Sequence, residues 1–237
     1  MNDLDQLITN YEPSDQAIEL IRNTHIALLV GISGAGKDTI KKQLLTKPDY
    51  SDIVSHTTRA PRVNNGIMEV ADIDYHFIDE STARNMLENH EFIEAKFVHH
   101  TVYGTSLKEL EKASSAHKIA VTDIDVQGVS EYKAISPDVV AIFVIPPSYS
   151  VWRERLAQRY ESTEAFEGEW TKRRNSAVSE LTHALEVPYY HFVINDSLER
   201  AVTVSDEIAH RPDVFLRKDD EARLRARDLL TAIETSL

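Results

Sequence analysis

The chain of 237 residues contains no cysteine, and this absence excludes whole classes of chemistry. Disulfide bonds, thiolate zinc sites and cysteine nucleophiles all require a thiol, so this protein can contain none of them. Long apolar runs are missing as well, because no stretch approaches the roughly 18 residues that a membrane span requires. Residues 1–5 lack the basic start and apolar core of a signal peptide. We therefore expect a soluble cytoplasmic protein without a membrane partner.

Basic residues are also in short supply, since 26 Lys and Arg residues stand against 39 Asp and Glu residues and the formal net charge is -13. This balance argues against a nucleic-acid partner, whose phosphate backbone is bound through clustered Lys and Arg side chains. A small polyanion needs only a local positive pocket. Two local groups of basic residues can supply one: Arg59 with Arg62, and Arg153 with Arg155, Arg159, Lys172, Arg173 and Arg174. A solvated helix face is the alternative interpretation of the second group.

Glycine is scarce too, yet three of the seven glycines fall within residues 31–36. The segment 31–38, Gly-Ile-Ser-Gly-Ala-Gly-Lys-Asp, follows the apolar run 26–30 and precedes residues 39–45, whose apolar side chains recur at helical spacing. Glycines between a buried strand and a helix can direct backbone N–H groups and the helix dipole at a phosphate. Lys37 adds a point charge for the β and γ phosphates. We predict a phosphate-binding loop, the alternative being an ordinary strand-to-helix turn.

One position departs from the usual pattern of such loops. The residue after the lysine is normally Ser or Thr, whose hydroxyl holds magnesium, and here it is Asp38. A carboxylate is also a hard oxygen ligand, and a helix N-terminus favours its charge. We therefore expect Asp38 to act on magnesium, directly or through water. The alternative is that Asp38 is only a favourable residue in the first helical turn.

Segments typical of strands and of helices alternate along most of the chain. Strands are predicted at residues 26–30, 53–59, 75–78, 92–98, 119–124, 139–145 and 192–194. Helices are predicted at residues 14–22, 39–45, 81–88, 107–117, 151–160, 171–185, 198–210 and about 218–235. Residues 63–73 are predicted as a loop, residues 102–106 as a turn into a helix and residues 161–169 as a mobile segment. The alternation predicts a single α/β domain with a parallel sheet and helices on both faces.

Eight segments carry a more specific signal. They are residues 31–39, 55–62, 74–77, 91–94, 103–105, 123–128, 146–148 and 195–196. The most distinctive is Ser-His-Thr-Thr-Arg-Ala-Pro-Arg over residues 55–62. In order and spacing, these segments resemble the guanylate kinase family over about residues 26–208.

This resemblance implies the fold of a P-loop kinase in one domain. A parallel core sheet flanked by helices would span about 25–53, 114–158 and 173–210. A small mixed GMP-binding subdomain would span about 54–113, and a mobile lid about 159–172. The segments 1–24 and 211–237 would be helical additions, and the loop 63–73 is longer than the family pattern.

The resemblance also implies an activity, the transfer of the γ-phosphoryl group of ATP to GMP or dGMP with magnesium. It assigns the ATP site to Gly31, Ser33, Gly34, Ala35, Gly36, Lys37, Asp38, Thr39 and Asn195. It assigns the GMP site to Ser55, Arg59, Arg62, Tyr75, Glu94, Tyr103, Thr105, Asp123 and Asp125. Magnesium would lie near Asp38 and Asp123.

The phosphate of GMP would be held by four of these side chains. Arg59 and Arg62 match the arginines that grip it, and forked guanidinium donors suit a phosphate better than a lysine does. Tyr75 and Tyr103 match the tyrosines that add hydroxyl donors.

The base would be recognised by an acceptor that fits guanine. Glu94 matches the carboxylate that accepts from N1–H and the exocyclic amine, two adjacent donors that adenine does not offer. Ser55 and Thr105 match hydroxyls near O6 of the base. Asp123 lies at the end of a predicted buried strand, where open parallel sheets place ligands, and Asp125 would support it. Either aspartate could instead cap the end of the strand.

The catalytic residues implied by the resemblance are Lys37, Asp123, Arg159 and Arg173. Arg159 and Arg173 match lid arginines that neutralise the charge of the transferring phosphoryl group. The Arg-Gly-Thr of the family lid reads Arg159-Tyr160-Glu161 in this chain, so its lid departs from the pattern.

Two other functions compete with this interpretation. Asp38 also matches the Gly-Lys-Asp of a related kinase that phosphorylates ribose 1,5-bisphosphate, although that enzyme would have no use for Glu94 and Thr105. A kinase-like binding module without catalysis is the other alternative. We would expect such a module to lose the residues of the phosphate loop first, and Lys37 is present. The ten histidines, including His99 and His100, are interpreted as ordinary polar residues, because neighbours on a strand point to opposite faces. The sequence leaves the oligomeric state open.

Overall fold

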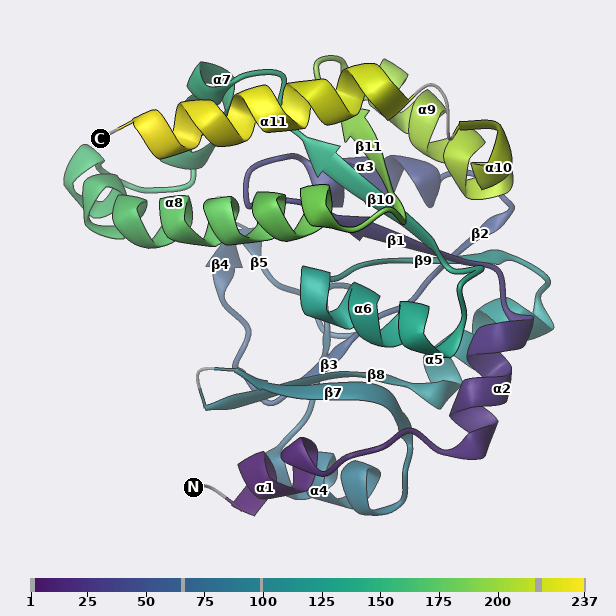
Figure 1. The fold of residues 1–237 in the computed structure, drawn as a ribbon. Coiled ribbons are helices and arrows are strands. Elements are labelled where there is room, and N and C mark those ends of the chain that lie inside the picture. Colours follow the sequence, from purple (N-terminus) through teal and green to yellow (C-terminus); the bar gives the residue numbers. More distant parts are fainter. Residues whose placement is uncertain (1–2, 65–66, 99, 216–218, 237) are drawn as a thin grey trace. The chain divides into compact units, whose positions relative to one another are not determined.

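The computed structural model describes residues 3–64, 67–98, 100–215 and 219–236, and backbone contacts divide the chain into two compact units. The first unit comprises Met1–Ile26, Asp49–Thr122 and Glu131–Asp138, and the second comprises Ala27–Pro48, Asp123–Ser130 and Val139–Leu237. Figure 1 labels the helices and strands of both. His99 lies outside the described residues.

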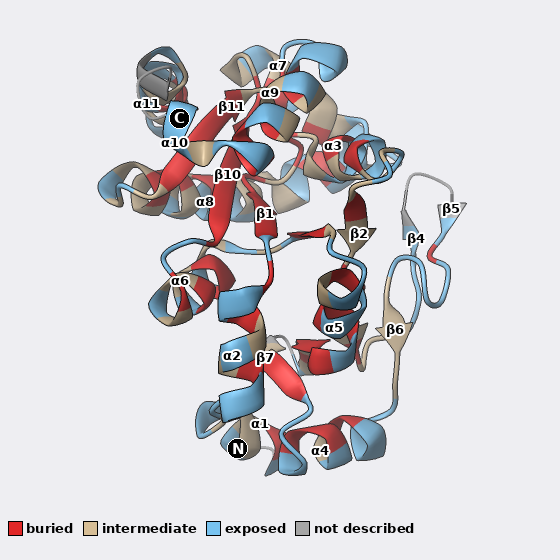
Figure 2. Cartoon of the chain, turned by 90° about the vertical axis from the view of Figure 1, so that its right-hand side faces the viewer, coloured by how far each residue is buried: buried red, intermediate tan, exposed pale blue. Residues whose placement is uncertain are grey.

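Three parallel strands form the centre of the second unit. They are β1 (Ile26–Val30), β10 (Val140–Ile145) and β11 (Tyr190–Ile194), in the order β11-β10-β1. Every residue of β1 and β10 is buried, as the colours of Figure 2 show. A strand covered on both faces needs apolar side chains at every position. The prediction of a parallel sheet with helices on both sides is confirmed.

Helices surround these strands. They are α3 (Lys37–Leu44), α7 (Tyr149–Ala157), α8 (Thr163–Glu186), α9 (Leu198–His210), α10 (Pro212–Phe215) and α11 (Asp219–Thr235). Among the described parts of the chain, none of the helices combines the length and the apolar character needed to cross a bilayer.

The C-terminal helix α11 packs along α8 and against β11 (Figure 1). The guanidinium of Arg223 lies 4.9 Å from the centroid of the Phe192 ring. At the other end of α11, Arg174 of α8 donates to the carbonyl oxygens of Ile233 and Glu234 at 2.9 and 2.8 Å. The last turn of a helix leaves such carbonyls without intrahelical partners. These contacts attach the added helix to the second unit.

A mixed sheet in the order β6-β3-β8-β7 organises the first unit. Its strands are β3 (His56–Thr57), β6 (His76–Phe77), β7 (Phe92–Val98) and β8 (Thr101–Ser106). The unit also contains the parallel pair of β2 (Tyr50–Asp52) and β9 (Ile119–Asp123), and the hairpin of β4 (Val63–Asn64) and β5 (Ile67–Met68). Its helices are α1 (Asp3–Thr9), α2 (Asp15–Asn23), α4 (Glu80–Glu88) and α5 (Leu107–Ser115), and α6 (Val126–Ile135) is divided between the units.

The N-terminal residues complete the apolar core of the first unit. Leu4 of α1 is buried in one cluster with Leu87 of α4 and Phe92 of β7. The Tyr11 hydroxyl donates to the Phe92 carbonyl oxygen at 2.5 Å, and burial raises the pKa of Tyr11 to about 12. The added N-terminal segment is therefore part of the folded core.

Two predictions of irregular structure are wrong. Residues 102–106 are not a turn but form most of β8, because Thr101–Ser106 pairs antiparallel with β7, and the predicted helix does begin at residue 107. Residues 63–73 are not a plain loop, since they contain the β4–β5 hairpin.

Several boundaries also differ from the prediction. Of residues 53–59, only His56–Thr57 is a strand, and α1 and α6 were not predicted. Helix α8 begins at Thr163 instead of residue 171, because Ser162 Oγ accepts from the Ala165 N–H at 3.2 Å. The Phe166 ring then packs 5.4 Å from that of Trp170, which adds apolar contacts to a segment that looks polar in sequence.

Candidate active site

The loop after β1 has a backbone that only glycine accommodates well. Gly31, Gly34 and Gly36 have φ values of 139°, 84° and 98°. A Cβ atom on Gly31 would lie 2.2 Å from the Val144 carbonyl oxygen of β10. A Cβ atom on Gly36 would lie 2.2 Å from Asn195 Nδ2. Both the dihedral angles and the close approach therefore require these glycines.

Three hydrogen bonds hold the loop in place. Lys37 Nζ donates to the carbonyl oxygen of Gly31 at 2.8 Å, so the lysine side chain folds back over the loop. Buried Asn195, which follows β11, donates through Nδ2 to Ala35 O at 2.8 Å. Trp152 Nε1 of α7 donates to Ser33 O at 2.8 Å. The loop is fixed from β11 and from α7, a rigid arrangement that suits an anion cradle.

The start of α3 carries the two other predicted ATP-site side chains. Gly36 is the N-cap residue of α3, and Asp38 and Thr39 are exposed in its first turn. Exposed backbone N–H groups at a helix N-terminus attract negative charge, which favours both a phosphate and the carboxylate of Asp38.

The six basic residues between Arg153 and Arg174 do not form one patch. Arg159 donates to Ser33 Oγ of the loop at 3.3 Å. Arg173 donates through Nε to the Tyr160 hydroxyl at 3.0 Å, so the tyrosine in place of the family glycine orients this arginine. The others have different roles or are exposed. Arg153 is paired to Glu167, Arg155 donates to Asn195 O, Arg174 donates to carbonyl oxygens of α11, and Lys172 is exposed.

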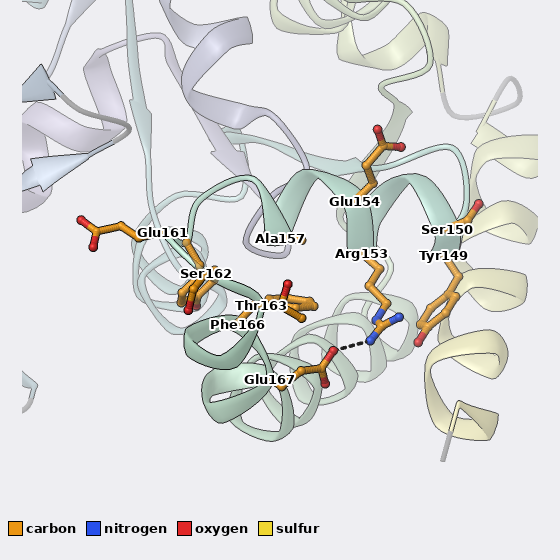
Figure 3. A pocket seen from close by; sticks show the side chains of 11 residues that line it. Tyr149, Ser150, Arg153, Glu154, Ala157, Glu161, Ser162, Thr163, Phe166 and Glu167 are labelled. Atoms are coloured by element: carbon orange, nitrogen blue, oxygen red, sulfur yellow. Dashed lines mark hydrogen bonds and ion pairs between the residues drawn. The ribbon is translucent and has the colours of Figure 1, made fainter.

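A pocket of about 660 Å³ lies between α7 and the start of α8 (Figure 3). Tyr149, Phe166 and Tyr160 line it together with the ion pair of Arg153 and Glu167, whose Nη2 and Oε1 atoms are 2.6 Å apart. The phosphate loop does not contribute to its lining. The pocket therefore belongs to α7 and the start of α8, and the glycine loop after β1 lies outside its lining.

The two aspartates at the end of β9 and just after it have different surroundings. Asp123 is exposed, with Oδ1 3.5 Å from Lys41 Nζ of α3. Asp125 Oδ1 accepts from the Gly128 N–H at 2.7 Å in the first turn of α6. Asp125 thus has the geometry of a helix N-cap, which differs from the cap at the strand end that was its alternative interpretation.

Glu180 of α8 is a charged group near the loop that the sequence did not indicate. Burial raises the pKa of Glu180, whereas the hydrogen bond from Ser176 and the charges of Lys37 and Arg173 oppose the rise. Ser176 Oγ and Glu180 Oε1 are 2.7 Å apart. The positions 173, 176 and 180 share one face of a helix, which is the signal that could have identified Glu180.

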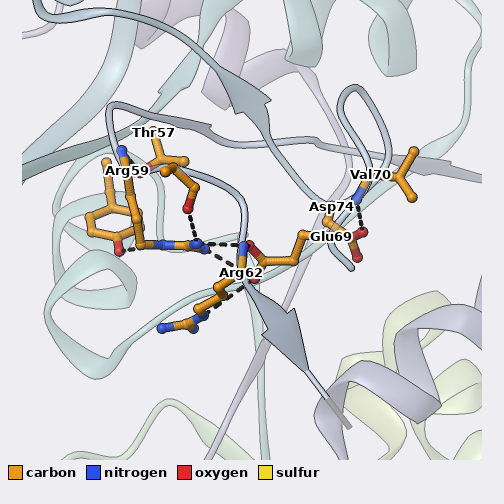
Figure 4. A network of polar contacts seen from close by, with 8 residues as sticks. Thr57, Arg59, Arg62, Glu69, Val70 and Asp74 are labelled. Carbon is orange, nitrogen blue, oxygen red and sulfur yellow. Dashed lines mark hydrogen bonds and ion pairs between the residues drawn. The ribbon is translucent and has the colours of Figure 1, made fainter. Parts of the chain in front are cut away.

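In the first unit, Arg59 and Arg62, two of the residues predicted to bind the GMP phosphate, lie together (Figure 4). Arg59 donates through Nε to the Tyr103 hydroxyl at 3.2 Å, and its guanidinium lies 5.2 Å from the centroid of the Tyr75 ring. Glu69 joins them, since its carboxylate bonds both Nη groups of Arg59 and lies 3.4 Å from Arg62 Nε. Sequence reasoning missed Glu69, which follows the unexpected hairpin.

The residues predicted to bind the base lie on neighbouring strands. Glu94 of β7 is directly opposite Thr105 of β8. Tyr132 is buried near them, and its pKa is raised by burial and by the Glu94 carboxylate. Ser55 precedes β3, and its carbonyl oxygen accepts from the His76 N–H at 2.9 Å.

A histidine pair lies beside Ser55. The rings of His56 and His76 are 4.6 Å apart, and His76 Nε2 lies 3.1 Å from Glu109 Oε1. Burial, and secondarily His76, lower the pKa of His56 to about 4. His56 is therefore neutral at pH 7, which suits its partly buried position.

The parallel sheet, the glycine loop and Lys37 define the second unit as that of a P-loop nucleotide-binding protein. A family model described as guanylate kinase matches residues 23–210. The guanylate kinase of Nitrosospira multiformis is 38% identical over 172 residues, which is 72% of this chain and 77% of that protein. That of Pseudomonas fluorescens is 36% identical over 172 residues, 72% of this chain and 79% of the relative. The chain belongs to the guanylate kinase family, which is a family of enzymes.

A solved structure has the same fold. The crystal structure of guanylate kinase from Anaplasma phagocytophilum aligns with a TM-score of 0.57 and 24% sequence identity. The alignment covers 89% of this chain and 95% of that one.

We predict that the protein loses stability in mildly acidic solution through His56. Its folded-state pKa of about 4 lies below the ordinary value of 6.5, so the unfolded chain takes up the proton first as the pH falls. The stabilisation by neutral His56 is complete above pH 6.5 and is lost between pH 6.5 and 4. After allowance for solvent screening of this partly exposed ring, we expect a loss of about 1 kcal/mol between pH 7 and 5.

Urea unfolding at pH 7 and pH 5 tests this prediction. The variant His56→Gln should lose about 1 kcal/mol less than the wild type between the two pH values. The exposed residue His117 provides the control His117→Asn, which should follow the wild type. Equal losses in His56→Gln and the wild type would contradict the assignment.

Proposed function

We propose that this protein transfers the γ-phosphoryl group of ATP to GMP or dGMP. The observation that carries the proposal is the arrangement of β7 and β8. Glu94 is paired with Thr105, and Tyr103 stands two residues before Thr105 on the same strand. Residues two apart on a strand point to one face, about 7 Å apart. The carboxylate for guanine and the hydroxyl beside Arg59 therefore share one face of one ribbon.

Phosphoryl transfer asks for positioning and charge neutralisation more than for covalent chemistry. In this proposal, the loop and Lys37 bind the β and γ phosphates of ATP. Arg159 and Arg173 neutralise the negative charge of the phosphoryl group while it is transferred. Their present partners, Ser33 Oγ and the Tyr160 hydroxyl, leave further N–H groups on each guanidinium for phosphate oxygens.

Magnesium fits the acidic residues of the second unit. Asp38 and Asp123 are both exposed, and carboxylate oxygens are the ligands that this ion prefers. When bound, magnesium would neutralise charge on the triphosphate. The proposal assigns Asp38 the place that the hydroxyl of Ser or Thr has in most phosphate loops.

The two alternative functions are not favoured. A ribose 1,5-bisphosphate kinase has no base to recognise, so the paired Glu94 and Thr105 would have no ligand. A binding module without catalysis would have no need of Lys37 or of the two arginines beside the loop.

The experiment that tests the function is ADP release by the purified full chain with a panel of nucleoside monophosphates and ribose 1,5-bisphosphate. We expect GMP to be preferred over AMP by a factor of about 10³ or more, as sites built on hydrogen bonds to their substrate achieve. Turnover of ribose 1,5-bisphosphate without turnover of GMP would overturn the proposal.

Glu94 should decide the choice of base. The variant Glu94→Gln keeps the size of the side chain but places an amide donor against the donors of guanine, so we expect kcat/KM for GMP to fall by about 10- to 100-fold. The affinity for ATP, measured by calorimetry, should be unchanged. Exposed Glu91 provides the control Glu91→Gln, which should retain GMP kinetics. Unchanged GMP kinetics in Glu94→Gln would disprove the guanine assignment.

Asp38 should set the magnesium dependence. We expect Asp38→Ser to keep substantial activity with a shifted magnesium optimum, because a hydroxyl can replace the carboxylate as an oxygen ligand. Asp38→Ala should be less active than Asp38→Ser, since it offers no ligand. The measurement is turnover against magnesium concentration in all three proteins, and a single shared curve would mean that Asp38 is only a residue of the helix terminus.

A further inference from the structure

Glu69 is a buried carboxylate shared by two arginines. Its side chain is only 5% exposed, whereas the side chains of Arg59 and Arg62 are 15% and 61% exposed. Oε2 accepts from Arg59 Nη1 at 2.7 Å and from the Arg62 backbone N–H at 3.0 Å. Oε1 accepts from Arg59 Nη2 at 3.1 Å and lies 3.4 Å from Arg62 Nε. Both carboxylate oxygens thus contact both arginines (Figure 4).

The backbone around Glu69 fixes the carboxylate. The Glu69 N–H donates to the Arg62 carbonyl oxygen at 3.0 Å, which closes the β4–β5 hairpin. On the other side, Asp74 Oδ2 accepts from the Val70 N–H at 2.8 Å, and the Asp74 N–H donates to Val70 O at 2.9 Å. Glu69 is therefore held between a hairpin and a turn, both visible in Figure 4.

The two arginines differ in how many N–H groups remain available for a further hydrogen bond. Arg59 uses Nε for Tyr103, Nη1 for Ala60 O and Glu69, and Nη2 for Glu69. A guanidinium has five N–H groups, so Arg59 retains one. Among the described residues, the Nη groups of Arg62 meet no acceptor at hydrogen-bond distance, and this side chain is mostly exposed.

We propose that Glu69 is a positioning residue for the phosphate of the monophosphate substrate. It orients Arg59 and Arg62 so that the last N–H of Arg59 and the Nη groups of Arg62 receive the phosphate together. This inference rests on the proposed function, because it takes GMP as the phosphate acceptor.

The physical reason is preorganisation. A long arginine side chain loses rotamer freedom when it binds a ligand, and a partner that has already ordered it reduces that cost. Although burial opposes it, hydrogen bonds from Arg59 and from the Arg62 N–H keep the pKa of Glu69 below its usual value. The carboxylate therefore stays charged and keeps its hold on the arginines at neutral pH.

A competing effect has the opposite sign. A carboxylate also carries negative charge, which repels an incoming phosphate. If repulsion were the larger effect, removing the charge of Glu69 would strengthen GMP binding. The experiment therefore separates the two by direction.

The test compares GMP with guanosine, which has the same base and sugar but no phosphate, by calorimetry on the full chain. We expect Glu69→Gln to weaken GMP binding by about tenfold or more, because each arginine loses a charge-assisted hydrogen bond. Guanosine affinity and ATP affinity should not change. Glu69→Asp, which keeps the charge on a shorter side chain, should recover part of the GMP affinity. Glu88 of α4, whose side chain is 52% exposed, provides the charge-matched control Glu88→Gln.

Three results would overturn the inference. Equal losses for GMP and guanosine would mean that Glu69 only maintains the fold, and tighter GMP binding would mean that it competes with the phosphate. Unchanged GMP binding would mean that the arginines are ordered without it. If the wild type itself binds no GMP, the proposed function fails instead, so the two failures are distinguishable.

Discussion

The second unit depends on one close approach of two backbones. At Gly31 the chain leaves β1 directly against the Val144 carbonyl of β10, at a distance that leaves no room for a Cβ atom. This crossing directs the loop over the carboxyl ends of the parallel strands and places the start of α3 there, where α/β sheets hold their ligands. Asn195 after β11 then bonds the loop from the next strand along. The conformation of the glycine loop thus follows directly from the packing of the sheet.

The first unit orders its arginines by a different physical device. Its sheet is small, and the residues proposed to bind the GMP phosphate are long side chains whose positions the backbone alone does not determine. Polar and charged contacts order these side chains instead. Arg59 is held by the Glu69 carboxylate, by the Tyr103 hydroxyl and by the face of the Tyr75 ring. In the proposed function, the backbone of the glycine loop and the paired guanidinium groups each present several hydrogen-bond donors to an anion.

The sequence predicts best those features that local chemistry decides. The apolar runs of β1, β10 and β11 are such features. It fails where tertiary pairing overrides local preference. Glycine and hydroxyl residues made 102–106 look like a turn, but β7 supplies a partner that makes them a strand.

The candidate site shows the same division. Lys37 and Arg59 follow from motif positions, and the structure places them in the expected loop and in the expected cluster with Tyr103. Glu69 and Glu180 do not follow from motif positions, because the unexpected β4–β5 hairpin brings Glu69 to Arg59 and burial raises the pKa of Glu180. Helix α1 was not predicted for the same reason, because its apolar residues become core residues only by packing with Phe92.

The position of the two tryptophans gives the protein a built-in optical probe. The chain has only these two, Trp152 and Trp170, and their ring centroids are 5.3 Å apart in one aromatic cluster of α7 and α8. The indole N–H of Trp152 is bonded to Ser33 O of the phosphate loop, so the polarity and the hydrogen bonding around that ring change with the loop. Tryptophan emission therefore originates beside the glycine loop, so the native fluorescence would follow nucleotide binding at the proposed ATP site without a label.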